Sequence, residues 1–99
     1  MPTRLMLHAP GASKEAVEEG IGYAETLLSH LTHPLELVFQ ARARIRSRGA
    51  TRHPDFLGLA PELIADAKVL EQAEAIAMLA CYGPRSAPAG SGLLLNEES

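Results

Sequence analysis

The stretch Ala75-Ile-Ala-Met-Leu-Ala-Cys81 decides which fold this sequence adopts. It is an unbroken apolar run that begins after Glu74 and is halted by the Gly-Pro pair at 83–84, which suits a buried strand. Ala, Leu, Met and Glu are also strong helix formers, so one long helix over residues 61–82 is the alternative. We interpret residues 75–81 as a central strand, because a helix with a solvated face does not need an unbroken apolar run.

Two earlier segments also have the character of strands. Leu5-Met6-Leu7 is a short apolar run followed by His-Ala-Pro-Gly, which is typical of a buried parallel strand that ends in a loop. Leu35 to Gln40 is the second candidate. Arginines then occupy every second position of residues 41–48, which favours a continuation of that strand, although a helix there stays open.

Helical patterns separate these strands. Ser13 is a suitable N-cap, and Pro34 ends the segment that follows. Gly20 and Gly22 lie within it and are interpreted as points of close approach to the sheet. A second helix begins at Pro61. The apolar positions with helical spacing are Val17, Ile21, Ala24, Leu28 and Leu31 in the first segment and Leu63, Ala67 and Leu70 in the second.

This order of elements predicts an α/β fold. We expect one small three-layer domain over residues 1–99, with a short parallel sheet flanked by helices. Loops are expected at 49–58 and 83–92, the latter flexible. A chain of 99 residues buries only about two-thirds of its unfolded surface. Association between copies is therefore expected, with the apolar patch Leu93–Leu95 as a contributor.

Composition excludes several classes of protein. The net charge of −3 argues against a nucleic-acid binder, and no apolar run approaches the length of a membrane span. The single cysteine cannot form an internal disulfide, and the N-terminus is too short for a signal peptide, so a cytoplasmic location is expected. No glycine-rich phosphate loop occurs, and no cofactor is predicted. The acid-free segment with Arg42, Arg44, Arg46, Arg48 and Arg52 is interpreted as a solvated, salt-bridged face in preference to an anion site.

Three stretches resemble the DsrE/DsrF-like family of small sulfur-relay proteins. They are LMLHAP, LELVFQ and AIAMLACYGPRSAPAG, which together cover the order and spacing of residues 3–90. The third resembles the family's strand that ends in a cysteine followed by a polar stretch. Where the family has Asn and a small hydroxyl residue after that cysteine, this chain has Tyr82-Gly-Pro-Arg-Ser86. The family's last strand is either missing here or supplied by a neighbouring subunit.

The resemblance implies a sulfur carrier or sulfurtransferase-like protein that holds a persulfide on Cys81. His8, at the end of the first strand, would stabilise the thiolate, which is the reactive form of the group. Arg85 and Ser86 would contact the ligand from the following loop. The partners would then be a sulfur donor or acceptor protein and further copies of the chain.

A non-catalytic oligomeric module that binds a small ligand or a partner protein is the alternative. Free cysteine is among the most buried residue types, so Cys81 is then structural. His30 and His33 are spaced like a pair of metal ligands, but two ligands are a weak signal, and no metal site is predicted.

Overall fold

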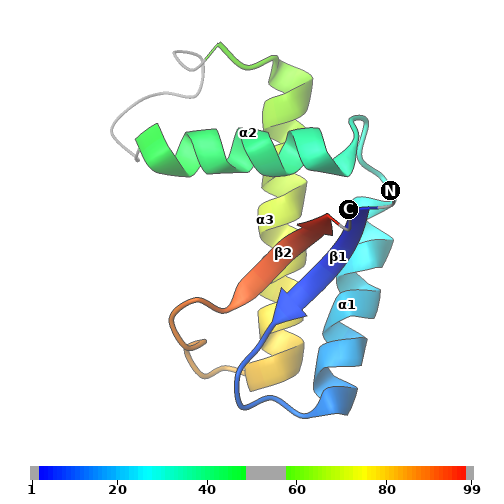
Figure 1. Ribbon diagram of the computed structural model, residues 1–99, viewed down its shortest axis with the longest axis vertical. Helices are drawn as coiled ribbons and strands as arrows, with labels where there is room; N and C mark the ends of the chain where they lie inside the picture. Colours follow the sequence, from blue (N-terminus) through cyan, green and yellow to red (C-terminus); the bar gives the residue numbers. More distant parts are fainter. Residues whose placement is uncertain (1–2, 49–57, 98–99) are drawn as a thin grey trace.

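The computed structural model describes residues 3–48 and 58–97. Their elements follow the order β1 (Thr3–His8), α1 (Lys14–Leu28), α2 (Leu35–Arg48), α3 (Pro61–Tyr82) and β2 (Gly92–Glu97). The two strands form a small sheet that lies over α1 and α3, and α2 crosses α3 (Figure 1). The chain is thus a compact α/β domain with three helices in its described part. None of the described helices is long and apolar enough to cross a membrane.

The sheet differs from the predicted one. β1 and β2 pair antiparallel, with Leu7 opposite Leu93 and Leu5 opposite Leu95. A parallel sheet was expected because residues 35–40 and 75–81 were interpreted as strands between helices, and both segments are helical. The segment around Leu93–Leu95, expected only as an apolar patch, is itself the second strand.

Residues 75–81 form the last turns of α3, so the strand prediction there was wrong and the long-helix alternative is correct. The apolar run at 75–81 does not reflect burial of a whole strand, as was inferred from the sequence. Ala77 and Cys81 face the interior, whereas Ile76 and Leu79 on the other side of the helix are 37% and 59% exposed. High helix propensity therefore prevails, and the helix accepts apolar side chains on its open face.

Residues 35–40 open α2 in place of the predicted second strand. The carbonyl of Pro34 accepts hydrogen bonds from the N–H groups of Leu37 and Val38, which starts the helix. Val38 and Ala41 are buried with helical spacing, and the helix continues through 41–48. The alternation of arginines in that segment is thus not strand periodicity, because the side chains distribute around a helix.

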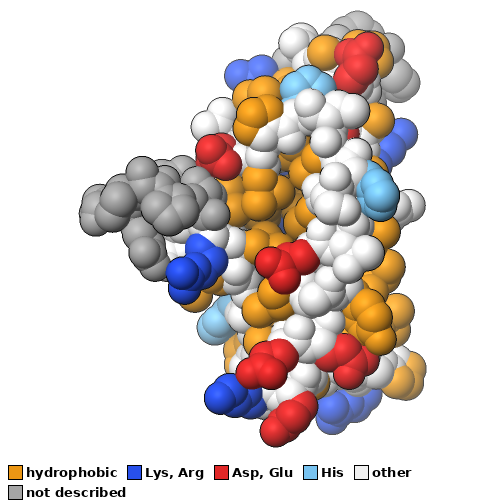
Figure 2. Space-filling view, turned by 90° about the vertical axis from the view of Figure 1, so that its right-hand side faces the viewer, with side chains coloured by type: hydrophobic (Ala, Val, Ile, Leu, Met, Phe, Trp, Pro, Cys, Tyr) orange, Lys and Arg blue, Asp and Glu red, His pale blue; other side chains and the backbone are white. Residues whose placement is uncertain are grey.

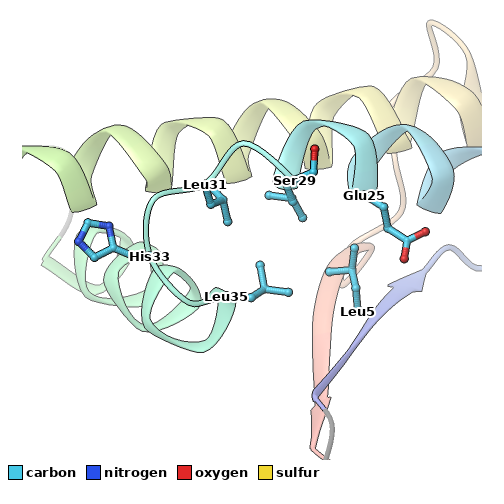
Figure 3. Close-up of a pocket in the computed structure, with 7 residues that line it drawn as sticks. Leu5, Glu25, Ser29, Leu31, His33 and Leu35 are labelled. Atoms are coloured by element: carbon cyan, nitrogen blue, oxygen red, sulfur yellow. The ribbon is translucent and has the colours of Figure 1, made fainter.

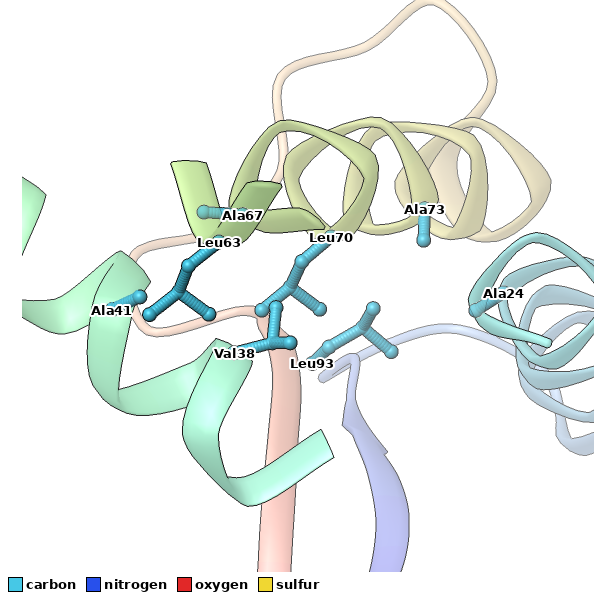
Figure 4. Close-up of a cluster of buried hydrophobic side chains, with 8 residues drawn as sticks. All are labelled: Ala24, Val38, Ala41, Leu63, Ala67, Leu70, Ala73 and Leu93. Atoms are coloured by element: carbon cyan, nitrogen blue, oxygen red, sulfur yellow. The ribbon is translucent and has the colours of Figure 1, made fainter. Parts of the chain in front are cut away.

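Small residues bring α1 and α3 together. Ala16, Gly20 and Ala24 recur every fourth position of α1, and Ala73, Ala77 and Cys81 do so in α3. Figure 4 shows Ala24 and Ala73 turned toward each other within the core. This close helix pair, called the small-residue seam below, forms one side of a core completed by Val38, Leu63, Leu70 and Leu93.

Gly20 is a point of close approach, but mainly to the backbone of α3 and not to the sheet as predicted, and Gly22 is not a point of close approach. A Cβ atom on Gly20 would lie 3.1 Å from the carbonyl oxygen of Ala77 and 3.1 Å from a methyl group of Leu7. A Cβ on Gly22 would meet nothing within 4 Å. The loop expected at 83–92 connects α3 to β2, which begins at Gly92, whereas nearly all of the loop expected at 49–58 lies outside the described residues.

Candidate functional site

Cys81 lies inside the small-residue seam, not at a strand end. Its side chain points at α1, where Sγ donates a long hydrogen bond of 3.8 Å to the carbonyl oxygen of Ala16. The residue is 9% exposed. A sulfur atom in this position fills the space between two helices, and the packing leaves little room for a bound substrate.

The electrostatic surroundings of Cys81 oppose a thiolate. Burial raises the pKa of the Cys81 thiol above its ordinary value. Cys81 also lies in the last turn of α3, at the negative end of the helix dipole, which further disfavours an anion. Reactive cysteines need a lowered pKa and access to solvent, and Cys81 has neither.

The other residues predicted for a sulfur site are not brought to Cys81. His8 is exposed at the end of β1, on the face of the sheet turned away from the helices, because Leu5 and Leu7 occupy the inner face. Arg85 is exposed, and its Nε donates to the carbonyl oxygen of Tyr82 at 3.1 Å, which caps the end of α3. Ser86 is exposed in the following loop. In the described part of the chain, these residues do not form a cluster around the thiol.

His33 and His30 do not form a metal pair either. The described residues hold no group of three or more potential ligands that could bind a metal ion. His30 is exposed, whereas Nδ1 of His33 lies 2.8 Å from a carboxylate oxygen of Asp66 near the start of α3. The histidine is thus part of a structural contact.

Asp66 clamps the connection between α1 and α2 onto α3. Its carboxylate accepts from the backbone N–H of Thr32 at 3.1 Å and of His33 at 2.9 Å, and from the Thr32 hydroxyl at 2.9 Å. Burial raises the pKa of Asp66, but hydrogen bonds from His33 and Thr32 lower it by more, so the net pKa lies below its ordinary value. The buried carboxylate therefore stays charged and holds the 32–33 turn in place.

A second acid, the partly buried Glu74, connects α3 to β2. Glu74 accepts from Nη1 of Arg42 at 3.1 Å and from the backbone N–H of Leu93 at 2.9 Å. Arg42 completes the contact, since its Nη2 donates to the carbonyl oxygen of Leu93 at 3.3 Å. Arg46 bridges Glu74 and Glu71 at 2.9 and 2.8 Å. Arginines 42 and 46 are thus paired with acids of α3, as expected, but Arg42 is buried and not on a solvated face. The side chain of Arg48 and the whole of Arg52 lie outside the described residues.

These contacts show which backbone N–H and C=O groups of the two strands face the outer edges of the sheet. Both backbone groups of Leu93 bind side chains of α2 and α3, so they point away from β1. In an antiparallel pair, the residue directly opposite such a position also turns its N–H and C=O away from the partner strand. Leu7, opposite Leu93, and Leu5, two residues earlier, therefore direct both backbone groups to the outer edge of β1. That edge borders no further strand in the described part of the chain, where the sheet has two strands.

A groove lies next to this open edge. Its volume is about 340 Å³. Leu35 and Leu5 extend into the same space from α2 and β1, beneath Leu31 (Figure 3). Glu25, Ser29 and His33 supply the polar part of the lining, and Leu28 completes it. Figure 2 shows this side of the molecule, where hydrophobic side chains gather between the charged ones.

Neither the buried Asp66, the partly buried Glu74 nor the open edge was predicted from the sequence. A signal for the acids was present, because Asp66 and Glu74 share the face of α3 that carries Leu63, Leu70 and Ala77. An acid on an apolar helix face predicts a buried partner. Nothing in the sequence indicated the open edge of β1, because the strand that pairs with its other edge, β2, was not recognised.

Comparisons with protein-family models, with curated proteins and with solved structures found no match to this chain. Inferences about its function therefore rest on the geometry alone.

Proposed function

We propose that this protein is a non-catalytic binding module that takes up an extended segment of polypeptide along the outer edge of β1. The observation that carries the proposal is the open backbone edge at Leu5 and Leu7 beside an apolar groove. Main-chain hydrogen bonds from a strand edge give affinity in this mode of recognition, and a side-chain pocket gives specificity.

The chemistry of the groove defines what it can accept. Four leucines form most of its lining, so an inward-facing apolar side chain of the added strand fits between them. The remaining lining residues are Glu25, Ser29 and His33. A strand with alternating apolar residues satisfies both the edge and the groove, since every second side chain faces the helices.

A sulfur-carrier function has less support. It requires a thiolate that a donor protein can reach, and the burial and raised pKa of Cys81 argue against one. It would also need a local opening of the small-residue seam for each transfer. The binding module needs no such opening, because the edge and the groove are already accessible.

Two matched variants test the proposal. Leu35 lines the groove and begins α2, where an acid is tolerated by the helix dipole, so Leu35→Glu alters the groove at little cost to the fold. Leu37→Glu is the control, because Leu37 lies in the same turn, is 39% exposed and does not line this groove.

The probe is a displayed library of random ten-residue peptides, selected on the wild-type protein. We expect enriched peptides with alternating apolar residues that bind wild type and Leu37→Glu and lose at least about tenfold in affinity on Leu35→Glu, which corresponds to one desolvated contact of about 1.4 kcal/mol. An absence of enriched peptides, or equal binding to both variants, would contradict the proposal.

A further inference from the structure

We infer that the segment taken up at the edge of β1 is β1 of a second copy, so that two chains form a symmetric dimer with a continuous four-stranded sheet. The inference rests on the proposed function of this edge. The strand order of the four-stranded sheet is β2-β1-β1-β2, with the two β1 strands antiparallel across a two-fold axis. Such an interface uses the same surface on both chains, as two-fold dimers do.

The hydrogen-bonding pattern of β1 matches itself in one register. If the axis passes beside Met6, then Leu5 of one copy lies opposite Leu7 of the other, and the same holds in reverse. Leu5 and Leu7 are the positions whose N–H and C=O groups point to the open edge. All of these groups are therefore paired in the dimer, without a bulge or a shift in register.

The side chains agree with this register on both faces of the sheet. Leu5 and Leu7 face inward, so Leu7 of the second copy enters the space beside Leu5 and the groove. On the outer face, Met6 and Leu94 are cross-strand neighbours and are 43% and 49% exposed. In the dimer the two Met6 side chains meet at the axis, and an apolar row Leu94-Met6-Met6-Leu94 crosses all four strands.

The other edge of the sheet is not equivalent. At the start of β2, Arg42 and Glu74 already occupy the backbone groups of Leu93, and their side chains stand where an added strand would lie. Charged groups at a strand edge are a common way to block pairing with another chain. β1 has no such contact at Leu5 and Leu7 among the described hydrogen bonds, so the pairing surface is β1.

Sedimentation equilibrium of wild type, Met6→Lys and Leu94→Lys tests the dimer. The two substitutions are matched, since both residues are half-exposed, lie on the same face and pair with each other. In a Met6→Lys dimer the two introduced lysines would face each other at the axis, at a Cα separation of about 4.5 Å. A lysine at position 94 is two strand spacings, about 10 Å, from the nearest β1 residue of the other chain.

We expect wild type and Leu94→Lys to dimerise with similar Kd values and Met6→Lys to dimerise at least about tenfold more weakly, because it adds like charges and removes an apolar contact. Thermal unfolding by circular dichroism checks that both variants fold. A wild-type protein that stays a 10.6 kDa monomer at about 1 mM, or equal weakening by both variants, would overturn the inference. If peptides selected on the wild-type protein lose affinity on Leu35→Glu while wild type is monomeric, the dimer fails and the proposed binding function stands.

Discussion

Replacing Gly20 by alanine tests the close packing of α1 on α3, with Gly22→Ala as a matched control. The two glycines lie two residues apart in the same helix, so alanine gives both the same gain in helix propensity, about 1 kcal/mol. They differ in surroundings. The added methyl group at position 20 would lie 3.1 Å from the carbonyl oxygen of Ala77, and the one at position 22 would be free.

The packing cost at position 20 sets the difference between the two variants. A carbon atom 3.1 Å from an oxygen and 3.1 Å from the Leu7 methyl group is several tenths of an ångström too close to each, so α1 or Leu7 must shift. Overpacking of this kind costs about 1–3 kcal/mol. Gly22→Ala should therefore stabilise the protein by about 0.5–1 kcal/mol, and Gly20→Ala should be about 1–3 kcal/mol less stable than Gly22→Ala.

Thermal and urea unfolding of the two variants measure this difference. For a domain of about 100 residues, 1 kcal/mol moves Tm by about 4–8 °C, so the two Tm values should differ by at least about 4 °C. If Gly20→Ala is stabilised as much as Gly22→Ala, then α1 does not approach α3 as closely as described. The position of Cys81 in the same seam would then need to be reconsidered as well.

Two further predictions concern the buried titratable groups. Cys81 should react with a thiol reagent at pH 7 at least about a hundredfold more slowly in the folded protein than in urea, because the thiol is buried and its pKa is raised. Equal rates would show that the small-residue seam opens readily. The folded-state pKa values of Asp66 and Glu74 lie below their unfolded values, so their stabilisation is complete above about pH 4 and is lost as the pH falls through the folded values. The urea concentration at the midpoint of unfolding should therefore be lower at about pH 3 than at about pH 6. The decrease should be smaller in an Asp66→Asn, Glu74→Gln double variant, and an equal decrease would assign the effect to other carboxyls.

Local signals in the sequence predicted some of the fold correctly. Ser13 was expected to cap the first helix, and its side chain accepts a hydrogen bond from the N–H of Ala16 at 3.1 Å. Pro61 was expected to begin the second predicted helix and stands at the start of α3. These features depend on residues close together in the chain, which is why the sequence alone identifies them.

The errors arise where the outcome depends on distant partners. The apolar run at 75–81 satisfies the patterns of a buried strand and of a helix, and what distinguishes them is the packing of Ala77 against Gly20. Leu93–Leu95 was interpreted from the sequence only as an apolar patch. It is one because Leu5 and Leu7, near the other end of the chain, pair with it. Such pairing is not visible in a local pattern.

The two edges of the sheet offer the strongest argument about function. Removing the buried Arg42 and the partly buried Glu74 from water is costly, so their ion pair by itself adds little net stability and a further role is expected. Its contacts supply one, because both groups bind the backbone of Leu93 and thereby close the start of the β2 edge. The chain thus commits two charged side chains to one edge and leaves Leu5 and Leu7 on the other edge open beside an apolar groove. The described hydrogen bonds protect the start of the β2 edge and leave the β1 edge at Leu5 and Leu7 unprotected. Since exposed strand edges promote pairing unless they are protected, this difference supports the proposal that a strand binds at β1.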